Sequence, residues 1–185
     1  MEFDSIYGYI KIYNDYTKAT NFIRGLGKDE TYPFINANMF SFGDWEIPYY
    51  YHNMMFGFAG TYKNFGYELS DWNSFILKIE NILRNIEFIN AQFHVSSSLA
   101  DITLYWQKKG SSHFGKDNDE KVVKKYGLTK TDEWYFGFGR RSPQSGYPKS
   151  GSLEPHEDLR NLGLGFIYPV PFQTLRSSLN WSDFN

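Results

Sequence analysis

The sequence predicts an α+β fold in which two helices cover one face of an antiparallel sheet. One observation is the stretch of residues 70–106, where an amphipathic helix precedes two alternating strands. A second is the earlier part of the chain, which switches between the two-residue period of strands and the longer period of helices. The first six expected elements follow a ferredoxin-like βαββαβ order, which further strands then extend.

The clearest helix lies within residues 70–86. Ser70 or Asp71 can accept from the free N–H groups of its first turn. Apolar residues recur every three or four positions, at Trp72, Phe75, Ile76, Ile79, Ile82, Leu83 and Ile86. The polar residues expected on the opposite, solvated face are Asn73, Lys78, Glu80, Asn81, Arg84 and Asn85. This helix should therefore have one buried side.

Two strands follow the helix. Apolar and polar residues alternate over residues 89–95 and again over residues 102–107, which is the period of half-buried strands. Residues 96–99 are small and polar enough for a turn. We expect an antiparallel hairpin whose apolar side lies under the helix.

The N-terminal part supplies the first strand and helix. Residues 6–13 alternate, and one side of this strand carries Tyr7, Tyr9, Lys11 and Tyr13. Residues 16–26 have helical periodicity, and Gly25 and Gly27 offer a C-terminal stop. Strands are then expected over residues 34–42 and 52–62, on either side of a loop.

The remainder of the chain is less regular. Residues 108–130 are lysine-rich and predict a short helix, and residues 134–141 alternate like another strand. The segment from about residue 142 is rich in proline, glycine and serine and then in apolar residues. With no linker or repeat, residues 1–185 are expected to form a single domain.

Composition excludes several classes of protein. The chain has no cysteine, and no stretch is apolar enough to cross a membrane. The acidic N-terminus is unlike a signal peptide, so we expect a cytoplasmic protein without a membrane contact. None of the four histidines stands at a metal-ligand spacing from another, so neither a metal nor another cofactor is expected.

Charge and aromatic content favour binding over catalysis. The net charge is −2, but it divides into −5 up to residue 106 and +3 beyond it. The 17 Phe, 15 Tyr and 5 Trp exceed what a core of this size easily absorbs, because each buried tyrosine hydroxyl needs a partner. We expect an aromatic and acidic surface that contacts a protein, at Asp44, Trp45, Glu46, Tyr49, Tyr50 and Tyr51.

Two alternatives remain open. A nucleic-acid-binding module would use the lysine-rich stretch, with Lys108, Lys109, Lys121, Lys124 and Lys125. A small enzyme would use His156 with Glu157 or Asp158 as acid–base groups.

The chain also resembles bacterial immunity proteins of polymorphic-toxin and contact-dependent-inhibition systems. The resemblance is carried by general character and by segments such as residues 56–60 (FGFAG) and 71–75 (DWNSF). It implies a cytoplasmic inhibitor, not an enzyme, that binds a cognate toxin domain, often a nuclease, and occludes its active site. It assigns a role to no individual residue.

Overall fold

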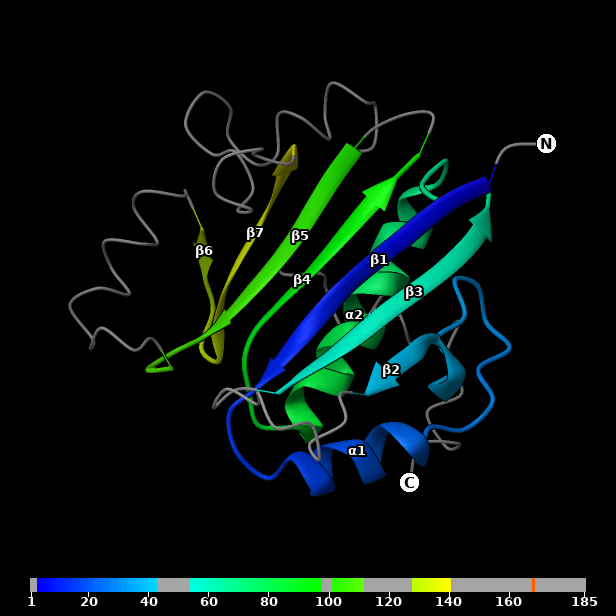
Figure 1. Ribbon diagram of the computed structural model, residues 1–185. Coiled ribbons are helices and arrows are strands. Elements are labelled where there is room, and N and C mark those ends of the chain that lie inside the picture. The colour runs from blue at the N-terminus through cyan, green and yellow to red at the C-terminus, as the bar shows by residue number, and fades with distance from the viewer. Residues whose placement is uncertain (1–2, 43–53, 98–100, 112–127, 141–167, 169–185) are drawn as a thin grey trace.

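The chain forms an antiparallel sheet that carries two α-helices (Figure 1). The computed structural model describes residues 3–42, 54–97, 101–111, 128–140 and 168. The strands are β1 (Phe3–Ile12), β2 (Phe40–Phe42), β3 (Met55–Lys63), β4 (Phe88–Ser96), β5 (Asp101–Lys108), β6 (Thr129–Lys130) and β7 (Trp134–Arg140). The helices are α1 (Tyr16–Arg24), the 3₁₀ turn η1 (Ala37–Met39) and α2 (Leu69–Asn85). The predicted α+β class is confirmed.

The seven described strands stand in the order β2-β3-β1-β4-β5-β7-β6, and every neighbouring pair is antiparallel. The first strand thus lies inside the sheet, between β3 and β4. The expected hairpin is confirmed by β4 and β5, in which Ala91 pairs with Trp106. Further strands extend the sheet beyond β4, as expected. The ferredoxin-like arrangement of the first six elements stays a prediction.

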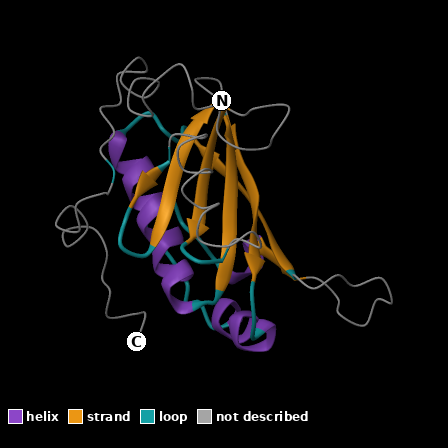
Figure 2. Cartoon of the chain, turned by 90° about the vertical axis from the view of Figure 1, so that its left-hand side faces the viewer, coloured by secondary structure: helices purple, strands orange, loops and turns teal. Residues whose placement is uncertain are grey.

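Helix α2 lies along one side of the sheet (Figure 2). Its Phe75 ring lies 6.1 Å from the Phe58 ring of β3 and 5.8 Å from the Phe93 ring of β4. Each such phenylalanine is fully or almost fully buried, which stabilises the fold by about 1.5–3 kcal/mol per side chain. Among the described residues, no helix is long and apolar enough to cross a membrane.

Helix α1 packs on the same face of the sheet as α2. Its Tyr16 ring lies 5.0 Å from the Phe56 ring of β3, and its Ile23 belongs to the same buried cluster. The Asp15 carboxylate accepts from the Lys18 N–H at 2.9 Å and caps the helix, and Gly25 ends it as predicted. Both helices therefore share one core.

The prediction of a solvated face on α2 is wrong for two residues. The side chains of Lys78 and Glu80 are only 6 % and 4 % exposed, whereas Arg84 and Asn85 are exposed as expected. Other segments of the chain cover this side of the helix. Residues 29–36 contact Lys78, and Tyr168 contacts Glu80.

The predicted strand over residues 34–42 is also largely wrong. Only Phe40–Phe42 pair with β3, after the turn η1. The preceding residues form a loop because side chains from elsewhere bind their backbone groups. Asp29 accepts from the Ile35 N–H, and Lys78 donates to the Pro33 carbonyl. Those groups are then not available to a strand ladder.

Tyr168 fixes one point of the C-terminal segment to the core. Its hydroxyl donates to the Glu80 carboxylate at 2.7 Å and accepts from the Trp134 indole at 2.8 Å. Its ring stacks on Phe136 with the centroids 3.8 Å apart. The same Glu80 oxygen accepts from the Trp106 indole at 3.0 Å. One buried carboxylate therefore joins α2, β5 and Tyr168.

Burial raises the pKa of the Glu80 carboxyl, although the hydrogen bonds from Trp106 and Tyr168 oppose the shift. The folded state therefore holds a proton on Glu80 at pH values where the unfolded chain has lost it. The contribution of this carboxyl to stability is full below its unfolded pKa and is lost as pH rises through its folded pKa.

We expect Glu80→Gln to be at least as stable as the wild type at pH 7, because the amide oxygen still accepts both hydrogen bonds and carries no buried charge. The advantage should shrink toward pH 4. Glu80→Ala should lose about 2–4 kcal/mol, since two buried donors lose their acceptor. Urea unfolding at both pH values measures these differences. A Glu80→Gln variant as unstable as Glu80→Ala would contradict the account.

Candidate functional site

The loop of residues 29–36, between α1 and η1, turns two aromatic side chains toward solvent. Tyr32 and Phe34 are 40 % and 37 % exposed, while Pro33 and Ile35 between and after them are buried. The Tyr32–Pro33 peptide bond is cis. Inward and outward residues therefore alternate although the segment is not a strand.

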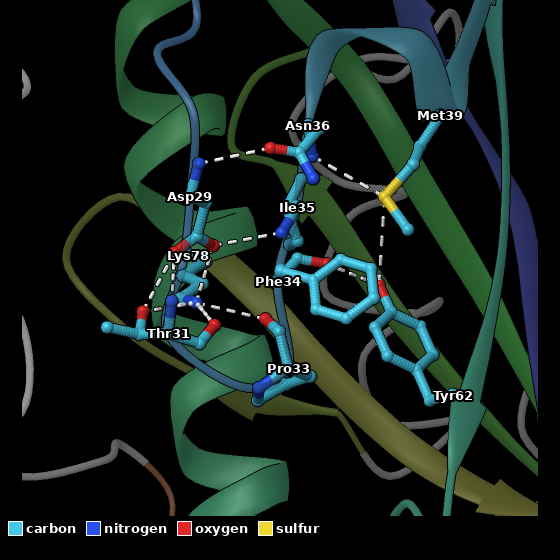
Figure 3. Close-up of polar contacts among 9 residues, drawn as sticks. All are labelled: Asp29, Thr31, Pro33, Phe34, Ile35, Asn36, Met39, Tyr62 and Lys78. Carbon is cyan, nitrogen blue, oxygen red and sulfur yellow. Dashed lines mark hydrogen bonds and ion pairs between the residues drawn. The ribbon is translucent and has the colours of Figure 1, made fainter.

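Lys78 holds this loop from inside. Its Nζ donates to Asp29 Oδ2 at 2.5 Å, to the Thr31 carbonyl at 2.7 Å, to Thr31 Oγ1 at 2.9 Å and to the Pro33 carbonyl at 2.9 Å (Figure 3). Four oxygens thus surround an ammonium group that has three protons. A buried charge is tolerated only where such partners replace its water. We call residues 29–36 with Lys78 the clamped loop.

Asp29 is both the counter-ion of Lys78 and a template for the loop. Its carboxylate accepts from the Thr31 N–H at 3.1 Å, the Thr31 hydroxyl at 2.8 Å and the Ile35 N–H at 2.9 Å. Burial alone would raise the pKa of this carboxyl, but the hydrogen bonds from Lys78, Ile35 and Thr31 hold it below its usual value. Asp29 is therefore ionised at neutral pH.

Tyr62 of β3 packs against the exposed rings of Tyr32 and Phe34. Its hydroxyl donates to the Phe34 carbonyl at 2.9 Å, and its ring lies 5.4 Å from the Phe34 ring and 6.0 Å from the Tyr32 ring. The Tyr32 hydroxyl donates to the Lys63 carbonyl at 2.8 Å. Burial and the charges of Asp71 and Asp4 raise the pKa of Tyr32 to about 12, so it stays a neutral donor.

Exposed carboxylates belong to the same loop and to the connection that follows β3. Glu30 within the loop is exposed and pairs with Lys28 at 2.7 Å. The β3–α2 connection, which begins after Lys63, presents Tyr67 at 51 % exposure, followed by the exposed Glu68. The clamped loop and this connection thus display aromatic and acidic side chains together.

This arrangement suits recognition better than chemistry. The loop offers rings at fixed positions, and its buried ionic groups are fully occupied by one another. Within the described part of the chain, no group of three or more His, Asp or Glu side chains could hold a metal ion. The chemistry available here is burial of aromatic surface against another molecule.

Most residues predicted for a site lie outside the described residues. These are Asp44, Trp45, Glu46, Tyr49, Tyr50 and Tyr51, then Lys121, Lys124 and Lys125, and finally His156, Glu157 and Asp158. The structure does place Lys108 and Lys109. The Lys108 Nζ lies 5.9 Å from the Phe88 ring centroid, and the Lys109 Nζ donates to the Asp132 carbonyl at 2.9 Å.

The sequence reasoning missed the clamped loop. Phe34 was assigned to the strand predicted over residues 34–42, Tyr32 was assigned to no element, and Lys78 was assigned to the solvated face of its helix. One signal was present in Leu77, which is apolar but lies off the main apolar stripe of α2. Its burial at 3 % exposure shows that this helix is covered on more than one side.

Comparison of the chain with models of protein families, with curated proteins and with solved structures finds no match.

Lys78→Met should destabilise the protein by about 3–5 kcal/mol, because it leaves the buried Asp29 carboxylate without its counter-ion. Lys28→Met, at an exposed ion pair, is the matched control and should leave stability almost unchanged. Urea unfolding at pH 7 measures both. Equal, small effects would show that the loop does not depend on Lys78.

Proposed function

We propose that this chain is a binding protein that neutralises a partner protein by covering its active site, as immunity proteins do. The observation that carries the proposal is the clamped loop, which presents Tyr32 and Phe34 to solvent. The sequence resemblance to immunity proteins is the reason for proposing a toxin as the partner. A cognate toxin domain, such as a nuclease, is the proposed partner.

The loop is suited to binding because its order is established before the partner arrives. Side chains of Asp29, Lys78 and Tyr62 already hold its backbone. Little conformational entropy then remains to be lost on association. Tyrosine and other large rings at such positions are the usual sources of binding energy at protein interfaces.

Charge supports a basic partner. Glu30 of the clamped loop and Glu68, which follows the exposed Tyr67 in the chain, are both exposed, and the chain up to residue 106 carries a net −5. A nuclease active site must accommodate a polyanion and is therefore expected to be basic. Acidic groups around aromatic anchors would speed its encounter with this surface, while the rings supply the affinity.

The other hypotheses stay predictions. The segment with Asp44, Trp45 and Glu46 stays a predicted second contact, in addition to the clamped loop. Lys109 is occupied by the Asp132 carbonyl, so no described contact favours the lysine-rich stretch as a nucleic-acid site. His156 with its acidic neighbours awaits an activity to be tested against.

The test is co-expression with the C-terminal domain encoded by the neighbouring upstream reading frame. We expect that domain to be toxic alone, to be neutralised by this protein and to co-elute with it. Tyr32→Ala and Phe34→Ala should each weaken binding by about tenfold or more. Tyr7→Ala is the matched control, because Tyr7 is 41 % exposed on a different surface.

Absence of toxicity, or toxicity without rescue, would refute the immunity role. Rescue that is unchanged in the Tyr32→Ala and Phe34→Ala variants would instead remove the clamped loop from the interface. A parallel triple alanine variant of Asp44, Trp45 and Glu46 would then show whether that segment makes the contact.

A further inference from the structure

A second surface lies on the face of the sheet opposite α2. On the β5 and β7 side its outward residues are buried, as Thr103, Tyr105 and Tyr135 show with exposures of 0 %, 1 % and 8 %. On β1 and β3 the outward residues are open, and Tyr7 and Met55 are 41 % and 52 % exposed. One half of this face is therefore accessible.

The accessible half contains a shallow groove of about 610 Å³ that follows β3. Its floor includes Gly57 and Ala59, which pair with Tyr9 and Tyr7 of β1. Both tyrosines have contacts on the β4 side. The Tyr7 ring lies 5.0 Å from the His94 ring, and the Tyr9 hydroxyl donates to Gln92 Oε1 at 3.4 Å. The small residues of β3 thus leave a channel next to Tyr7 and Tyr9 of β1.

The far wall of the groove combines polar and apolar residues, since Met39 and Phe40 line it too. Asn38 of η1 and Ser41 of β2 line it, and Ser41 pairs with Gly57 of the floor. A Cβ at position 57 would clash with Ser41, since it would lie 2.4 Å from Ser41 Oγ, so the Ser41 side chain lies directly over Gly57. The amide and the hydroxyl can both donate and accept hydrogen bonds along the channel.

Charge on this surface has one sign. The outward charged residues of β1, β2 and β3, within the described chain, are Lys11 and Lys63, and no carboxylate lies among them. Lys11 pairs with Met55 and Lys63 with Phe3, so the two lysines stand about 27 Å apart along the strands. The nearest outward carboxylate on the strands beyond is Asp101 of β5, which lies 3.7 Å from His94.

We infer that this groove binds single-stranded nucleic acid. Alternate residues of one strand stand about 6.8 Å apart, so Tyr7 and Tyr9 offer successive stacking positions for unpaired bases, which every base can use. Lys11 and Lys63 neutralise phosphates at the two ends, and Asn38 and Ser41 reach base or sugar edges. Open sheet faces with exposed aromatic residues are a common platform for single-stranded RNA.

This inference is independent of the proposed inhibitor role. The groove and the clamped loop carry charges of opposite sign, and Tyr7 and Tyr32 belong to different surfaces. It also differs from the nucleic-acid hypothesis drawn from the lysine-rich stretch, because its residues lie on β1 and β3.

Fluorescence anisotropy of labelled oligo(U) and oligo(dT) of about 12 nucleotides tests it, with a hairpin duplex as comparison. We expect both single strands to bind, the duplex to bind more weakly, and binding to fall between about 50 and 200 mM salt. Comparing the RNA with the DNA distinguishes the two sources of single strands.

Variants locate the site. Tyr7→Ala should weaken binding by about fivefold or more, while Tyr7→Phe, which keeps the ring, should bind like the wild type. Lys11→Ala and Lys63→Ala should each reduce the slope of log K against log salt by about 0.7. Tyr67→Ala, at 51 % exposure on the β3–α2 connection, should have no effect.

Three results would overturn the inference. The first is no binding of either single strand at protein concentrations up to about 100 µM. The second is displacement of the oligonucleotide by poly-glutamate at equal charge, which would show that any polyanion suffices, including an acidic polypeptide. The third is binding that survives Tyr7→Ala and is lost in a Lys108→Ala, Lys109→Ala double variant.

Discussion

The buried ammonium of Lys78 is the constraint on which much of this structure depends. Removing such a group from water costs several kcal/mol, and this cost is offset only where charge and hydrogen bonds replace the solvent. Asp29, Thr31 and Pro33 supply the replacement. Because these oxygens come from one loop, the position of the charge determines the path of residues 29–36. Two carbonyls that would otherwise face solvent or a strand become ligands of the ammonium.

A similar arrangement occurs one half-turn further along α2, with the opposite charge. Glu80 is as deeply buried as Lys78, and its partners are the indole of Trp106 and the hydroxyl of Tyr168. The helix thus presents a cation to a loop that precedes it in the chain and an anion to a residue that follows it by 88 positions. Between these two contacts, the apolar side of the helix packs on the sheet. Helix α2 is therefore a central element, covered on several sides.

The sequence was sufficient to predict the helices and strands whose apolar residues recur at a regular local spacing. Helix α2, the β4–β5 hairpin and β1 all follow from the spacing of apolar residues such as Phe75, Phe93 and Ile10. It was not sufficient for the clamped loop or for the burial of Glu80, because both depend on contacts between residues that are distant in the sequence. Lys78 and Asp29 are 49 residues apart, and a lysine on a helix normally indicates a solvated face. The alternation of residues 34–42 was real, but hydrogen bonds to side chains replaced the strand ladder that it predicted.

The short length of β2 has a consequence for how the protein behaves among copies of itself. At three residues, this edge strand offers few free backbone groups to which another chain could add a strand. The residues that could have lengthened it have their N–H and carbonyl groups turned inward, toward Asp29, Lys78 and Tyr62. The ionic contact that shapes the loop thereby also keeps residues 33–35 from lengthening this edge strand.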